Sequence, residues 1–224
     1  MSVRGERLGL DIEQLFDYTV VMPLPPTLSS DGKDIASLLA PGRFVVSGPG
    51  DLTGRFLTAL CPALLRGASV LWLDAGNSFN AYGAGYATRS LGVDARAALS
   101  RVSLARPFNL YQLETMVKVK VPERWRGEAI IVADPMPLFY DADVPAAAAR
   151  RVLTRVLEGI ASLRAPWVAL LPDRRAPAGR EGWDEEFGRS ADGFTRFYGT
   201  NAADDRTDAP GGGGGLEALQ TGPA

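Results

Sequence analysis

The residues best placed for chemistry form a glycine-rich turn between a predicted strand and a predicted helix. The strand is FVVSG at 44–48, the turn is GPGDLTG at 48–54, and the helix is predicted over 55–66. Backbone N–H groups of such a turn, aided by the positive end of the helix dipole, can hold a phosphate group. The candidate phosphate-binding residues are therefore Gly48, Gly50, Thr53, Gly54 and Arg55.

This turn departs from the phosphate-binding pattern G-x-x-x-x-G-K-S/T. Pro49 stands where the first glycine belongs, although Gly48 could serve with one inserted residue. Arg55 replaces the lysine that reaches the outer phosphates, and Phe56 replaces the hydroxyl residue that binds Mg²⁺. Phenylalanine has no oxygen for a hard cation, and Asp51 adds negative charge where phosphates would lie. A plain strand-to-helix turn without a ligand is the alternative interpretation.

Composition excludes several other chemistries. The chain has 224 residues, no histidine and a single cysteine, Cys61. A disulfide within the chain, a zinc site of His and Cys, and Ser-His-Asp or Cys-His catalysis are therefore excluded. The formal net charge of −2 gives no bulk signal for nucleic-acid binding. Because no stretch approaches the ~20 apolar residues of a membrane span, we expect a cytoplasmic protein without a membrane partner.

Strand-like and helix-like segments alternate along most of the chain. Buried-strand patterns are predicted at 44–48, 69–76, 102–105, 128–135 and 166–173. This alternation predicts an α/β core domain at 41–199, with a mostly parallel sheet flanked by helices on both faces. An edge strand is expected at 194–199. Residues 1–40 are predicted to be an irregular lead-in, and 200–224, with five consecutive glycines, a disordered tail.

Several core segments resemble the RecA/RadA family of P-loop recombinases. LWLDAGNSF at 71–79 resembles the second strand and following turn of that family, and the segment at 91–117 resembles its next stretch. IIVADPMPLF at 130–139 resembles the Walker B strand, with Asp134 in the position of the aspartate. The pieces agree in order and spacing over roughly residues 42–175. The resemblance implies a RecA-like P-loop core, and it adds Asp134 to the candidate nucleotide-binding residues.

The resemblance also locates what is missing. The general base of the family is a glutamate two residues after the aspartate of the second strand, and counting from Asp74 that position is Gly76. A glycine cannot polarise the attacking water. Pro135 follows Asp134 where the family usually has serine. With lysine, hydroxyl and glutamate all absent, we expect no active ATPase, no bound metal, and either no cofactor or weakly bound ATP.

Two basic stretches could contact single-stranded DNA. KVKVPERWR at 118–126 interleaves basic residues with Trp125, and a second stretch follows the fifth predicted strand, near the acidic residues 184–186. The candidate contacts are Lys118, Lys120, Arg124, Arg126, Arg174 and Arg175. Ordinary solvated surface charge is the alternative interpretation of both stretches.

These features predict a catalytically degenerate RecA-like protein that acts as an accessory or regulatory factor in DNA recombination or repair. Its expected partner is a recombinase or a repair polymerase complex. The apolar segment at 16–26 could pair with a sheet edge of a neighbouring subunit in an oligomer, or pack against its own domain. The alternatives are an active but atypical ATPase that uses Arg55 and Asp134, and a structural protein-interaction domain with no DNA role.

Overall fold

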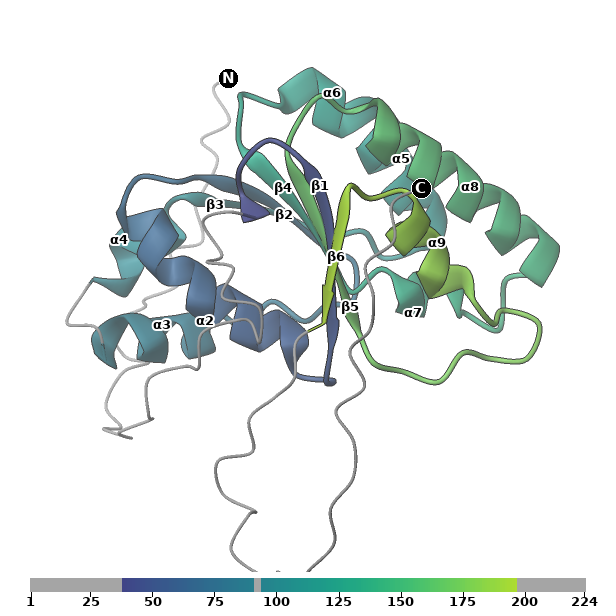
Figure 1. Cartoon of the computed structure of the whole chain (residues 1–224), viewed down its shortest axis with the longest axis horizontal. Coiled ribbons are helices and arrows are strands. Elements are labelled where there is room, and N and C mark those ends of the chain that lie inside the picture. The colour runs from purple at the N-terminus through teal and green to yellow at the C-terminus, as the bar shows by residue number, and fades with distance from the viewer. Residues whose placement is uncertain (1–37, 91–93, 197–224) are drawn as a thin grey trace, which may run out of the picture.

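The computed structural model describes residues 38–90 and 94–196. Its strands are β1 (Arg43–Gly48), β2 (Val70–Asp74), β3 (Val102–Ala105), β4 (Ala129–Ala133), β5 (Trp167–Pro172) and β6 (Gly193–Arg196). They form one sheet in the order β3-β2-β4-β5-β1-β6, and every neighbouring pair is parallel (Figure 1). The predicted α/β class with a parallel sheet is confirmed.

The central strands are apolar on both sides because helices cover both faces of the sheet. Every residue of β4 and β5 is buried. Successive strand residues point to opposite faces, so Ile130 and Trp167 enter one core while Ile131 and Val168 enter the other. The sheet is thus the middle layer of three.

The helices divide between the two faces (Figure 1). One layer consists of α2 (Leu52–Leu65), α3 (Ala81–Ser90) and α4 (Ala95–Leu99). The opposite layer consists of α5 (Leu110–Thr115), the π-helical turn η2 (Met116–Lys120), α6 (Val121–Arg124), α7 (Met136–Phe139), α8 (Ala146–Ser162) and α9 (Trp183–Arg189). Among the described residues, no helix has the length and apolar character that a membrane crossing requires.

Some boundaries differ from the sequence-based prediction. The helix after β1 begins at Leu52, three residues before the predicted start at 55, because Leu52 and Thr53 are already buried against the sheet. The basic stretch at 118–126 continues α5 through η2 and α6, so most of it is helical rather than a connector. Most of the lead-in at 1–40 and the whole tail at 200–224 lie outside the described residues, as does the end of the strand expected at 194–199.

Candidate functional site

The glycine-rich turn joins β1 to α2 at the carboxyl edge of the sheet, as expected, but it is short. Residues 49–51 alone separate the strand from the helix. The backbone N–H of Leu52 donates to the Pro49 carbonyl at 2.9 Å, and that of Arg55 donates to the Asp51 carbonyl at 3.1 Å. The first of these bonds closes the turn, and the second is the first i→i−4 bond of the helix.

The glycines of this turn are not needed by its conformation. Neither Gly50 nor Gly54 has a positive φ, and a Cβ atom on either would meet nothing within 4 Å. Gly48 is the last residue of β1, and its carbonyl accepts from the N–H of Asp173 at 2.6 Å. The structure therefore places these residues in a tight strand-to-helix connection, and neither the backbone conformation nor a protein neighbour requires glycine at positions 50 and 54.

The side chains of the turn are also committed to the protein itself. Arg55 Nε lies 2.5 Å from Asp51 Oδ2, so the arginine at the lysine position is paired with a carboxylate. Asp51 occupies the N-cap position of α2, yet its side chain accepts no hydrogen bond from the helix backbone. Phe56 is fully buried, with its ring centroid 6.4 Å from that of Trp72. The position that a Mg²⁺-binding hydroxyl would take is thus part of the core.

A second aspartate–arginine pair lies at the end of β2. Asp74 is fully buried, and its Oδ1 accepts from the backbone N–H groups of Ser78 at 2.7 Å and Phe79 at 3.1 Å. Its Oδ2 accepts from Arg106, which follows β3, at 2.9 Å from Nε and 2.8 Å from Nη2. The carboxylate therefore orders the turn after β2 and holds an arginine from the neighbouring strand end.

A third pair joins the ends of β4 and β5. Asp134 has a positive φ of 49°, uncommon for a residue with a side chain, and its Oδ2 lies 2.5 Å from Nη2 of Arg174. Its Oδ1 is buried and has no hydrogen-bond partner. Burial raises the pKa of Asp134, the cation of Arg174 lowers it in part, and the charge of Asp74 raises it further. Asp134 is thus a buried carboxylate with one paired oxygen and one oxygen without a partner.

Gly76 packs directly against Asp134. Its N–H donates to the Ala133 carbonyl at 3.1 Å, which continues the pairing of β2 with β4 beyond the strand ends. A Cβ atom at position 76 would lie 2.5 Å from both Cβ and Oδ2 of Asp134. In this conformation the position that would carry the general base has no room for any side chain, and least of all for a second carboxylate.

A fourth pair completes the row. Arg196, the last residue of β6, places Nη2 at 2.7 Å from Oδ2 of Asp173, which follows β5. Because all six strands are parallel, the four pairs lie along the same edge of the sheet. A phosphate group at this edge would have to compete with resident carboxylates for each of these arginines. These four arginines are thus already neutralised by carboxylates of the same chain, which disfavours a charged ligand at this edge.

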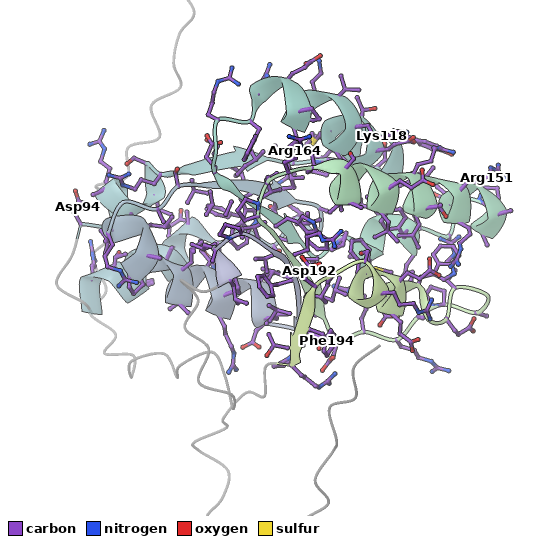
Figure 2. All side chains as sticks on the ribbon, turned by 45° about the horizontal axis from the view of Figure 1, so that its top comes forward. Asp94, Lys118, Arg151, Arg164, Asp192 and Phe194 are labelled. Atoms are coloured by element: carbon purple, nitrogen blue, oxygen red, sulfur yellow. The ribbon has the colours of Figure 1, made fainter. Side chains whose placement is uncertain are left out.

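The structure separates the predicted nucleic-acid contacts into two places. Arg174 and Arg175 follow β5 at the carboxyl edge, where Arg174 is held by Asp134 and Arg175 is exposed. The other four lie on or just after η2 and α6, in the helical layer of α8. Figure 2 labels Lys118 in that layer together with Arg151 and Arg164. A single binding site could include both groups only if its ligand reached from the carboxyl edge of the sheet to this helical layer.

The 118–126 stretch also differs in detail from the expectation. Trp125 is half-buried and packs against the hydrophobic core, and its indole N–H donates to the Glu128 carbonyl at 2.7 Å, so its ring is only partly accessible for base stacking. Lys120 lies 3.4 Å from Glu123, and both side chains are exposed. The exposed aromatic rings of this layer are instead Phe108 and Tyr111.

Sequence reasoning did not find the pairing partners of the edge. The partners that were missed are Arg106, Asp173 and Arg196. Each of them lies at or just after the end of a strand, and this position was the signal that could have identified them.

Within the described residues, no three His, Cys, Asp or Glu side chains gather as a metal site would require. Comparison of the chain with known family models and with curated proteins gives no match.

The contact between Gly76 and Asp134 predicts a strong positional effect. Gly76→Ala should lower the free energy of unfolding by about 1–3 kcal/mol, because the new methyl group overlaps the Asp134 side chain. Gly50→Ala is the matched control, with open space around its Cβ, and should leave stability unchanged or raise it slightly. Urea unfolding of the two variants measures both effects, and equal stabilities would contradict the packing described.

The raised pKa of Asp134 predicts a pH dependence with a definite sign. The folded chain holds the Asp134 proton to a higher pH than the unfolded chain, whose carboxyl has a pKa near 3.8. The stabilising contribution of the protonated group is fully present below that value and is lost as pH rises through the folded pKa. Asp134→Asn cannot titrate, so its stability relative to the wild type should increase from about pH 4 to about pH 7. A difference that stays constant or falls over this range in urea unfolding would be inconsistent with this ionisation.

Proposed function

We propose that this chain is a RecA-like protein that has lost nucleotide hydrolysis and acts as an accessory factor in DNA recombination or repair. The fold part of the proposal is supported by the parallel sheet and by the strand–turn–helix connection at its carboxyl edge, where nucleotide sites of α/β proteins lie. The biological part is supported by the resemblance of the segments at 71–79, 91–117 and 130–139.

One observation carries the loss of hydrolysis: Asp134 is enclosed by groups that leave it no catalytic partner. Arg174 pairs with Oδ2 of this carboxylate, and Gly76, at the position where a glutamate would be needed, packs against Cβ and the same oxygen. Phosphoryl transfer depends on positioning and on charge stabilisation, and loss of several such groups removes orders of magnitude in rate. The surviving aspartate alone cannot supply them.

The Mg²⁺–nucleotide that the RecA resemblance implies does not fit the residues present. The turn at 49–51 is too short to wrap a phosphate, and the Asp51 carboxylate stands at the start of α2 where the phosphate charge would lie. Phe56 offers no oxygen and is turned into the core. Asp134 already has a cation beside it. No hydrolytic step is therefore assigned to this edge.

A protein that keeps this fold without nucleotide hydrolysis must act by binding partners at its surface. The helical layer with η2 and α6 carries exposed Lys118 and Lys120, and Phe108, which precedes α5 in the same layer, is 78% exposed. Tyr111 and Lys120 line the same shallow hollow, together with Asn109 and Met116. Exposed aromatic rings beside lysines suit either a single-stranded nucleic acid or a protein partner.

Nucleotide binding tests the first half of the proposal. Titration calorimetry with ATP and Mg²⁺ should show no binding in the micromolar range, and phosphate release should not exceed the protein-free rate, because the edge lacks the cation and base that hydrolysis needs. Micromolar binding with turnover that Arg55→Ala and Asp134→Ala both abolish would establish the atypical ATPase instead.

Binding of single-stranded DNA tests the second half. Lys118→Glu/Lys120→Glu should weaken binding in a mobility-shift titration and reduce the slope of log affinity against log salt by about 1.4, because two phosphate contacts with the single strand are lost. Arg96→Glu on α4, an exposed cation in the opposite layer, is the matched control and should change neither quantity. If the wild type binds no DNA at low salt, alone or with a co-purified recombinase or polymerase, a protein-interaction role without DNA is supported.

A further inference from the structure

The segment between β5 and α9 is tied down across the ends of the strands by two arginines. Residues 173–182 contain a turn but no helix or strand. Near its start, Arg174 reaches from the end of β5 to Asp134 at the end of the neighbouring β4. Near its end, Arg180 donates to the carbonyls of Phe139 and Val144, on either side of the short loop after α7. The segment therefore lies as a strap over the chain that follows β4.

The two attachments differ in kind. Arg180 is 6% exposed, and its guanidinium also stacks over the ring of Trp183 at 5.6 Å, so this end is fixed inside the protein. The side chain of Arg174 is 38% exposed, and its guanidinium forms an ion pair with Asp134. At one end of the segment, the partly exposed Arg174 thus lies over a buried carboxylate. At the other end, the buried Arg180 attaches the segment to the core.

Asp134 requires a positive charge at this position. Its side chain is 7% exposed, one oxygen has no hydrogen-bond partner, and the carboxylate of Asp74 is near enough to raise its pKa. Asp74 brings its own counter-ion, Arg106, so that each of the two aspartates has one guanidinium. An ionised carboxylate in such a place is costly unless it is paired.

We propose that Arg174 is an internal counter-ion that stands where a divalent cation would otherwise be held by Asp134, so that arginine and metal exclude one another. A guanidinium keeps its charge at every accessible pH and, being part of the chain, cannot diffuse away. Asp134 is then neutralised whatever the magnesium concentration, and the fold has no need of a metal. This inference rests on the proposed function, which identifies Asp134 as the former metal-binding position.

An ordinary structural ion pair would give a different result when the arginine is removed. Its loss would destabilise the protein, and magnesium would not help, because nothing about the site would suit a metal. If Arg174 replaces a metal, its removal takes the partner from Oδ2 of Asp134, so that both oxygens of this buried carboxylate lack a partner. Oxygen ligands of this kind are what Mg²⁺ and Mn²⁺ bind.

The experiment compares the thermal midpoint of the full chain in EDTA and in saturating MgCl₂. The wild type should show equal midpoints. Arg174→Met should unfold at a lower temperature in EDTA and gain about 3 °C or more at ten times the dissociation constant of Mg²⁺. Arg174→Met/Asp134→Asn should lose the magnesium response. Arg196→Met, which removes the arginine from the exposed pair with Asp173, is the matched control and should show none.

Each outcome decides the question. If Arg174→Met is unfolded in EDTA, circular dichroism with added MgCl₂ gives the same readout: refolding supports the proposal, and failure to refold overturns it. A magnesium response in the wild type, or an equal response in Arg174→Met/Asp134→Asn, also overturns it. ATP turnover by the wild type would instead overturn the proposed function, so the two failures are distinguishable.

Discussion

Two carboxylates buried at the ends of adjacent central strands impose the main electrostatic constraint on this molecule. Asp74 and Asp134 lie at the carboxyl edge of β2 and β4, and neither could remain ionised there without a positive partner. Arg106 and Arg174 provide the two charges from the ends of β3 and β5. The arrangement thus connects four consecutive positions of the sheet edge and fixes the segments that follow those strands.

The parallel sheet is what makes this arrangement achievable. Because every strand runs in the same direction, residues from four remote parts of the sequence arrive at one edge, where other α/β proteins bind their ligands. Here that edge is occupied by side chains of opposite charge that satisfy one another. The arginines of this edge are therefore balanced by carboxylates of the same chain.

The sequence predicted the features that depend on local patterns. Apolar runs and their alternation with helices predicted the parallel sheet, and the position of Asp134 at a strand end followed from the residues before it. The partners of the aspartates could not be predicted, because Arg106 and Arg174 are separated from them by 32 and 40 residues and are brought close only by the strand order. The start of α2 was misplaced for a similar reason: burial of Leu52 against the sheet, rather than helix propensity, determines it.

The early start of α2 has an evolutionary consequence. Residues 52–56 already belong to a helix whose apolar side chains, Leu52 and Phe56, are seated in the core, so point substitutions there alter the core instead of rebuilding a ligand loop. A longer loop could be gained only by inserting residues ahead of Leu52, since unwinding the first turn of the helix would withdraw the buried Leu52 and Phe56 from the core. Many substitutions could thus accumulate in this stretch without lengthening the connection between β1 and α2.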